Sequence, residues 1–197
     1  MLGIGQAEAA RSLDRSAVRR LSWVTGVAAQ LPVEDGSVDI VASSFVDQSL
    51  RSRIAALREA YRILRPGAAV AVVTWLANDL PFAPWRVSSE LLDELHIVRP
   101  PSAETALFRS LPSAASLVRR AGFRDVHAAS DVVEYQWTLD AFLHCAWESE
   151  EPEPLDSLDD DTRSRLDRLW QKRLGLLAED ELRYRDLVAY VTGERPA

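Results

Sequence analysis

Two apolar runs flank an amphipathic segment in the stretch from Leu31 to Trp75. The first run, Val38 to Ala42, is apolar except for Asp39, and the second, Ala68 to Trp75, is apolar except for Thr74. Continuous apolar runs of this kind are typical of strands that are covered on both faces. With the helical spacing between them, they predict a parallel strand–helix–strand unit.

The segment between the two runs has the period of a helix. Its apolar residues recur at three- and four-residue spacing and form one stripe: Ile54, Leu57, Tyr61 and Leu64. Such a stripe packs on a sheet while the arginine-rich opposite side faces water. Pro66-Gly67 is expected to end the helix, because proline cannot continue it and glycine turns tightly.

Shorter elements are expected on both sides of this unit. Upstream, residues 7–20 are rich in alanine and arginine and predict a helix, and Leu21 to Thr25 (LSWVT) predicts a short strand. Downstream, Ser113 is a good cap for a helix that Gly122 stops. A strand over Phe123 to Ala129 follows that helix.

The last third of the chain is predicted to be helical before a final strand. Thr138 is a candidate cap for a helix with Phe142 and Trp147 on one face. A second helix is marked by leucines between Leu166 and Leu177, and Leu187 to Thr192 (LVAYVT) predicts the final strand.

Composition narrows the class of protein. A chain of 197 residues fits one domain with a sizeable core. The net charge of −7 argues against nucleic acid as the main partner. Cys145 is the only cysteine, so neither a disulfide framework nor a cysteine metal cluster is expected. No apolar run reaches membrane-spanning length and no signal-peptide core opens the chain. These features predict a cytoplasmic protein.

Three motifs in order resemble a known family. They are WVTGVAAQLPVEDGSVDIV from Trp23, LREAYRILRPGAAVAVVTW from Leu57, and ASLVRRAGFRDVHAA from Ala115. Together they resemble class I S-adenosylmethionine-dependent methyltransferases, in particular the small-molecule branch with the type 11 methyltransferase domain and the quinone-biosynthesis enzymes. The resemblance implies an α/β fold: one domain over residues 1–197, a Rossmann-like sheet with helices on both faces, and a helical substrate lid inserted at residues 138–180 before the last strand.

The sequence departs from this family in its first part. The family's first strand with its glycine-rich turn, and the acidic residue that ends the second strand and binds ribose, have no counterpart here, so the first two strands are expected to be missing and the chain truncated. Val27 stands where the family has an aspartate that meets the adenine amino group. The gap this leaves in the sheet predicts that the Leu21–Thr25 strand pairs directly, that a second chain fills the gap in a homodimer, or that residues are lacking.

The resemblance also implies site residues. Those placed near the cofactor, S-adenosylmethionine, are Gly26, Val27, Ala28, Ser43, Ser44 and Phe45. Those placed near a small-molecule acceptor are Asp47, Gln48, Trp75, His144 and Trp147. An ordinary loop or core role is the competing interpretation for each, and helix capping for Asp47-Gln48.

No catalytic dyad is expected, because positioning supplies most of the rate of methyl transfer to a nucleophilic acceptor. The three histidines are scattered without metal-ligand spacing, so no metal site is predicted. Two functions remain open: a methyltransferase on a small-molecule acceptor, or a methyltransferase-derived protein without cofactor, acting as a pseudoenzyme, partner subunit or small-molecule binder.

Overall fold

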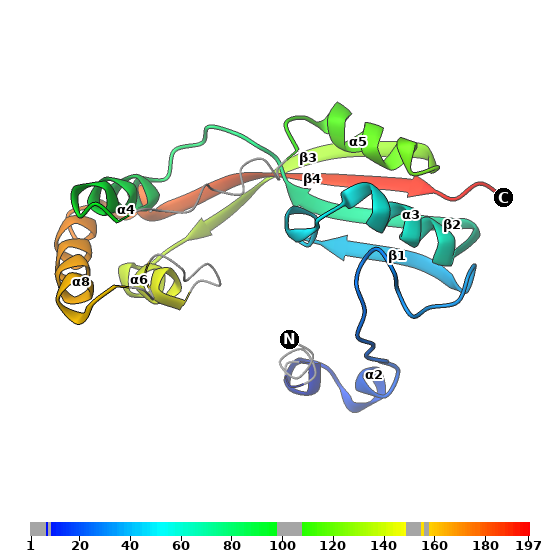
Figure 1. Cartoon of the computed structure of the whole chain (residues 1–197), viewed down its shortest axis with the longest axis horizontal. Coiled ribbons are helices and arrows are strands. Elements are labelled where there is room, and N and C mark those ends of the chain that lie inside the picture. The colour runs from blue at the N-terminus through cyan, green and yellow to red at the C-terminus, as the bar shows by residue number, and fades with distance from the viewer. Residues whose placement is uncertain (1–6, 8, 98–107, 149–154, 156–157) are drawn as a thin grey trace.

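A computed structural model of the chain describes residues 7, 9–97, 108–148, 155 and 158–197. Its sheet has four strands in the order β1 (Val38–Ser44), β2 (Leu64–Trp75), β4 (Arg183–Glu194) and β3 (Arg124–Gln136). β1 and β2 are parallel, and the other two neighbouring pairs are antiparallel (Figure 1). The predicted parallel strand–helix–strand unit is therefore confirmed.

The helix of this unit, α3 (Arg53–Ile63), ends earlier than the sequence predicted. Ser52 caps its start by accepting from the Ala55 N–H at 3.3 Å. At its end, Leu64 is already extended and fully buried, so Pro66-Gly67 lies inside β2 and does not end the helix. The carbonyls of the last turn accept from the guanidinium of Arg195 instead, at 3.0 and 3.1 Å.

A second helix, α5 (Leu111–Arg120), packs beside α3. Its cap is Ser110, three residues earlier than expected, because Ser110 and Ser113 exchange hydrogen bonds in a capping box. Gly122 follows the helix at a φ of 112°, as its predicted role as a stop requires. We call the sheet together with α3 and α5 the sheet half of the molecule. Its core consists of buried side chains from these helices and strands: Leu57, Ala60, Val70, Val72, Leu117, Val118 and Val191.

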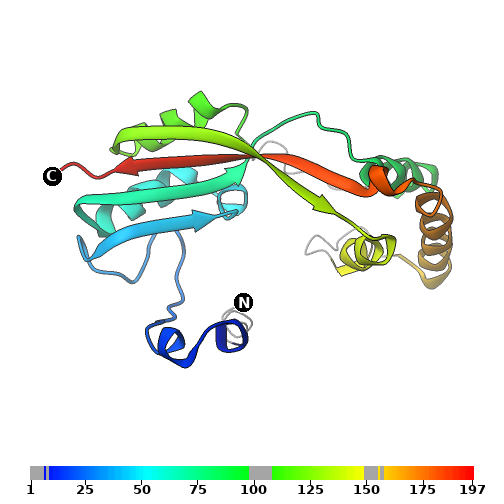
Figure 2. The same ribbon diagram turned by 180° about the vertical axis from the view of Figure 1, so that it is seen from behind.

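The two faces of the sheet differ. α3 and α5 cover the same face, and Figure 2, seen from behind, shows no described helix on the other face. Ile40 on β1 is 68% exposed there, and Tyr190 on β4 is 43% exposed. The sequence predicted helices on both faces of the sheet, but the described helices cover one face only. The described residues before β1 form a separate arm and do not cover the other face.

That arm extends away from the sheet and differs from the predicted helix and strand (Figure 1). The helix over residues 7–20 is broken near Asp14, which caps the short α2 (Arg15–Val18). Residues 21–25 form no strand, since they pair with no other strand and Trp23 is 42% exposed. The arm joins the sheet half where the Leu31 N–H donates to Glu59 at 2.7 Å.

Three helices form a cap at the far end of the molecule: α4 (Ala83–Glu94), α6 (Leu139–Glu148) and α8 (Asp160–Leu174). α6 and α8 are inserted between β3 and β4, as the sequence predicted, and α4 packs against α8. Their core is a second cluster that includes Phe82, Leu91, Phe142, Leu166 and Trp170. β3 and β4 run well beyond their predicted ends as a two-stranded ribbon that reaches this cap (Figure 1). No helix among the described residues is both long enough and apolar enough to span a bilayer.

We expect the isolated chain to self-associate through β1. The outer edge of this strand pairs with no other strand in the described part of the chain, and an unpaired apolar edge recruits another chain. Light scattering on the purified protein should therefore give a mass above that of one chain, and Ile40→Lys should lower it. A monodisperse monomer of the unmodified chain would contradict this expectation.

Candidate functional site

The carboxyl ends of β1 and β2 meet at one edge of the sheet, and an aromatic pair lies there. Phe45, directly after β1, stacks on Trp75 at the end of β2 with ring centroids 4.4 Å apart. Phe45 has a φ of 53°, which is unusual for a residue with a bulky side chain. Its N–H donates to the Val73 carbonyl at 2.9 Å, so the backbone is held in this conformation. Strain of this kind is often found at ligand sites.

A large pocket opens beside this aromatic pair. Its volume is about 890 Å³, within the range of small-molecule sites. It lies between the end of β2, the segment that follows it, α4 and the beginning of β4. The lining includes three aromatic residues and several polar ones: Trp75, Trp85, Tyr184, Asn78, Asp79, Arg109, Arg185 and Asp186. We call it the aromatic pocket.

Asp186 is the centre of a hydrogen-bond network in the aromatic pocket. Its carboxylate accepts from the Tyr184 hydroxyl, from Asn78 Nδ2 at 2.5 Å and from the Leu187 N–H at 2.7 Å. Burial and this carboxylate both raise the pKa of Tyr184 above its usual value. Tyr184 therefore stays protonated near neutral pH and donates a hydrogen bond to Asp186. The network fixes the Tyr184 hydroxyl and the Asn78 amide against the Asp186 carboxylate in the lining of the aromatic pocket.

A smaller, mostly apolar cavity of about 200 Å³ lies between β1, α3 and the arm. It brings together Ala28, Ser43 and Asp47. Asp47 is only 5% exposed, and its Oδ2 lies 2.9 Å from Arg53 Nε. The Arg53 N–H is directed at the Asp47 carbonyl, 3.4 Å away, so Oδ2 accepts no hydrogen bond from the described residues. Burial raises the pKa of Asp47, and the charge of Arg53 opposes that rise.

The residues expected near the cofactor are only partly brought together. Ala28 and Ser43 line the same small cavity. Val27 begins a tight turn of the arm, where the Gln30 N–H donates to its carbonyl at 2.8 Å, and it is 65% exposed. Gly26 precedes that turn, beside Pro32. The other two, Ser44 and Phe45, end β1, with Ser44 exposed and Phe45 against Trp75.

The residues expected near the acceptor fall into three places. Trp75 lines the aromatic pocket, and Asp47 lines the small cavity. Gln48 is turned back on the chain, since its Nε2 donates to the Phe45 carbonyl at 2.6 Å. The structure thus gives Asp47 an ion-pair role and not the helix-capping role considered from the sequence; Ser52 caps α3.

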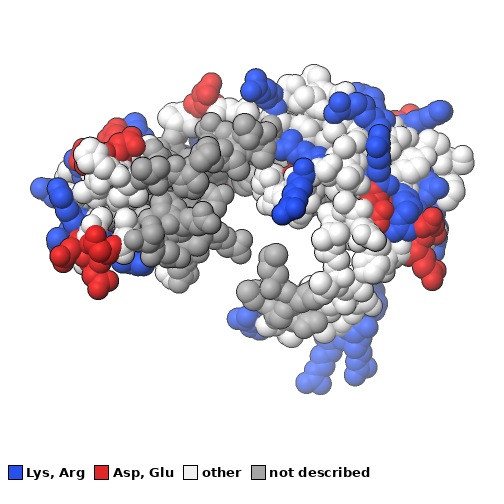
Figure 3. All heavy atoms as spheres, in the orientation of Figure 1, with Lys and Arg blue, Asp and Glu red and all other residues white. Residues whose placement is uncertain are grey.

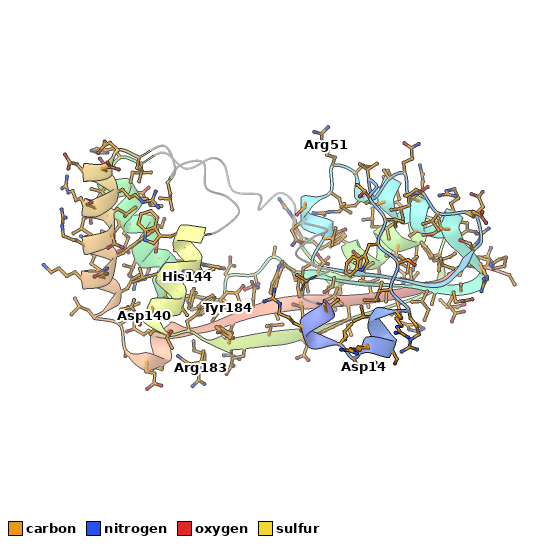
Figure 4. The ribbon with its side chains drawn as sticks, turned by 90° about the horizontal axis from the view of Figure 1, so that it is seen from below. Asp14, Arg51, Asp140, His144, Arg183 and Tyr184 are labelled. Atoms are coloured by element: carbon orange, nitrogen blue, oxygen red, sulfur yellow. The ribbon has the colours of Figure 1, made fainter. Side chains whose placement is uncertain are left out.

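His144 and Trp147 lie on α6 in the cap and do not line the aromatic pocket. Trp147 packs against the buried Trp170, with centroids 5.0 Å apart. Its Nε1 donates to Asp167 at 3.2 Å, and the guanidinium of Arg163 lies over its ring. These contacts make Trp147 part of the cap's own packing. His144 is exposed on the same helix (Figure 4).

The sequence analysis did not single out the polar centre of the aromatic pocket. Tyr184 and Asp186 are two residues apart on β4, so their side chains share a face of the strand. Asn78 comes from a loop distant in sequence and only the fold places it beside Asp186. Within the described ranges, no cluster of three or more His, Cys, Asp or Glu residues could hold a metal ion.

Comparison with known proteins links the first part of the chain to a family. Residues 3–72 match the model of a methyltransferase domain family. The ubiquinone/menaquinone biosynthesis C-methyltransferase of Paracoccus denitrificans is 37% identical over 83 residues, which is 42% of this chain and 31% of that protein. The aligned part thus spans less than a third of the length of the curated relatives that the chain matches.

Solved structures extend the likeness to the whole chain at the level of the fold. The YcgJ protein of Bacillus subtilis aligns over 100% of this chain and 79% of its own, with a TM-score of 0.60 and 15% identity. The [4+2]-cyclase SpnF aligns over 100% of this chain and 63% of its own, with a TM-score of 0.54 and 16% identity. A phosphoethanolamine N-methyltransferase of Haemonchus contortus, bound to S-adenosylhomocysteine, aligns over 100% and 41%, with a TM-score of 0.50 and 16% identity. Residues 3–72 thus match a methyltransferase domain family, and the chain as a whole shares the fold of these solved structures.

Proposed function

We propose that the protein serves S-adenosylmethionine-dependent methyl transfer to a small aromatic acceptor, and that this acceptor binds in the aromatic pocket. The family match supports the reaction class. The observation that carries the acceptor site is the position of the pocket at the carboxyl ends of the parallel strands, where ligands of open α/β sheets bind. The curated relatives' names refer to C-methylation in quinone biosynthesis, so a hydroquinone ring is the acceptor class we favour.

The walls of the aromatic pocket suit such a ring. Trp75 and Trp85 offer indole faces, and aromatic pairs gain about 0.5–1.5 kcal/mol beyond the burial of area. The Tyr184–Asp186 pair offers polar atoms that could bind a ring hydroxyl. These residues position an acceptor and exclude water from it, which is the protein's main task in this chemistry. The raised pKa keeps Tyr184 protonated near neutral pH, so we assign it no role as a base.

The fit of the described residues to the cofactor is poorer. The small cavity beside Ala28 and Ser43 has about 200 Å³, below the range of about 300–1,000 Å³ of small-molecule pockets. Val27 offers no acceptor for an adenine amino group, and it faces solvent. The described residues alone therefore do not form a complete site for S-adenosylmethionine.

This mismatch favours a second candidate function: a small-molecule binder derived from a methyltransferase and working without the cofactor. The aromatic pocket is extensive while the cofactor contacts are few. The same fold in the [4+2]-cyclase shows that it carries activities other than methyl transfer. Both candidate functions use the aromatic pocket for the small molecule.

Trp75→Ala tests the pocket that both functions share. We expect the variant to bind methoxyhydroquinone about tenfold more weakly than the parent by calorimetry, because a stacking surface and its buried area are lost. Trp23→Ala, a tryptophan on the arm that does not line the pocket, should leave binding unchanged. Loss of equal size in both variants, or no binding by the parent, would contradict acceptor binding at this pocket.

A methyl-transfer assay then separates the two functions. The full chain is incubated with methoxyhydroquinone and radiolabelled S-adenosylmethionine at millimolar concentration, so that a weak cofactor site is still filled. Label in the extracted quinol, reduced by Trp75→Ala, supports the methyltransferase. Binding of methoxyhydroquinone without transfer of label supports the cofactor-free binder.

A further inference from the structure

A further hollow, distinct from the aromatic pocket, lies on the helical face of the sheet half, between the start of α3 and the end of α5. Its volume is about 600 Å³. Four of its lining residues are arginines and the other three are aliphatic: Arg51, Arg53, Arg58, Arg120, Leu50, Ile54 and Leu117. We call it the arginine pocket. None of its arginines lines the aromatic pocket, while Leu50 and Arg53 also line the small cavity between β1 and α3.

The charge of this hollow is unusual for the protein. The chain has a net charge of −7, yet none of the described residues that line the arginine pocket is acidic. Arg53 is paired with Asp47 and also lies over the Phe108 ring, 4.7 Å from its centroid. The other three arginines contact no acidic side chain among the described residues.

Two arginines near β1, unlike Arg58 and Arg120 of the arginine pocket, are paired with acidic side chains. Arg62, at the end of α3, pairs with Glu59 at 2.7 Å and with Asp35. Arg65 pairs with Asp39. Acidic side chains thus neutralise the arginines beside β1, whereas no described acidic residue pairs with Arg58 or Arg120 around the hollow. Like charges brought together without a counter-ion repel each other, so an anion would relieve that repulsion.

The surroundings add to the positive potential. Arg51 and Arg53 flank the N-terminus of α3, an eleven-residue helix whose first turn has no acidic residue. The positive end of its dipole therefore faces the same region as the guanidinium groups. Figure 3 shows blue side chains gathered over this part of the sheet half, and Figure 4 shows Arg51 extending outward beside it.

We propose that the arginine pocket binds a phosphorylated small molecule through its phosphate group. Guanidinium groups bind phosphate oxygens in bidentate pairs, which suits arginine better than lysine and suits phosphate's several oxygens. Arg58 from α3 and Arg120 from α5 hold the anion from two sides, and Arg51 closes the rim. Leu50, Ile54 and Leu117 supply an apolar floor for the rest of the ligand.

Inorganic pyrophosphate is the probe that tests this proposal, titrated calorimetrically into the full chain. We expect saturable binding that weakens at least about tenfold in the double variant Arg58→Gln/Arg120→Gln, because two charge-assisted hydrogen-bonding groups are lost. The double variant Arg165→Gln/Arg168→Gln is the matched control, since it removes two charges from exposed arginines on α8 outside the pocket. It should leave the affinity unchanged. Circular dichroism melts should show that all variants remain folded, as both arginines are exposed.

Citrate provides the second arm of the experiment. It carries comparable negative charge on carboxylates, so it separates recognition of phosphate from simple attraction of anions. Weaker binding of citrate than of pyrophosphate, with the double variant affected and the control not, supports the proposal. Equal binding of the two anions, equal loss in variant and control, or no binding by the parent overturns it. These readouts involve neither S-adenosylmethionine nor the aromatic pocket, so they are independent of the proposed function.

Discussion

Leu57→Asp is expected to unfold the sheet half of the protein. Leu57 lies on the inner side of α3, is 8% exposed and belongs to the same cluster as Val70, Val72 and Leu117. A carboxylate at this position would lose its hydration without gaining a partner, because Arg53, four residues earlier on α3, is already paired with Asp47. We expect a loss of several kcal/mol, comparable to the whole stability of ~5–15 kcal/mol of an ordinary domain.

Thermal melts followed by circular dichroism measure this effect. Arg58→Asp is the control, since it places the same side chain on the exposed side of the same helix. The control should melt within a few degrees of the parent, whereas Leu57→Asp should show no cooperative melt of the sheet half. A melting temperature of Leu57→Asp close to that of the parent would show that α3 packs through a different face.

The parts of the fold that could be predicted from the sequence are those with a local cause. The β1–α3–β2 unit follows from two apolar runs and one helical stripe, and α5 from its caps and periodicity. The ends of these elements were harder to predict. α3 stops before Pro66 because Leu64 is drawn into the sheet and Arg195, distant in sequence, binds the last carbonyls.

The arm and the ribbon could not be predicted because their causes are not local. Residues 21–25 have the composition of a strand, but a strand needs a neighbour, and the described chain offers them none. β3 and β4 extend far past their apolar runs because they pair with each other up to the cap, as at Tyr135 and Tyr184. Pairing along a two-stranded ribbon tolerates exposed residues, so the hydrophobic pattern ends before the strand does.

The candidate site also contains residues that could be predicted from local sequence and residues that could not. Trp75 and Phe45 were expected near a ligand because they follow strands whose carboxyl ends share an edge, and the structure stacks them there. The Tyr184–Asp186 pair was not expected, because the segment that carries it has no motif and acquires its role only when Asn78 is folded against it. These site assignments remain predictions until ligand binding is measured.

Weak binding of S-adenosylmethionine by this chain is the second large effect that we expect. The resemblance to the methyltransferase family implies that its glycine-rich turn and ribose-binding acidic residue have no counterpart in residues 1–197, and that Val27 stands where the family has the aspartate that meets adenine. Hydrogen bonds to charged groups contribute about 1.5–3 kcal/mol each. Losing the two carboxylate contacts should thus weaken binding by about a hundredfold or more, at about 1.4 kcal/mol per factor of ten.

Calorimetric titration with S-adenosylhomocysteine tests this expectation directly, and two arm variants locate its cause. Val27→Asp should improve the affinity by about tenfold to a hundredfold without restoring a micromolar dissociation constant, since it restores one contact of three. Val24→Asp is the matched control, because Val24 is 60% exposed on the same arm and its replacement by aspartate adds the same charge. It should leave the affinity for S-adenosylhomocysteine unchanged.

A micromolar dissociation constant for the unmodified chain would refute the expectation of weak binding. The small cavity beside Ala28 and Ser43 would then have to open into a full cofactor site without the family's carboxylates. Weak binding that Val27→Asp improves and Val24→Asp does not would instead assign the turn at Val27 to the adenine end of the cofactor.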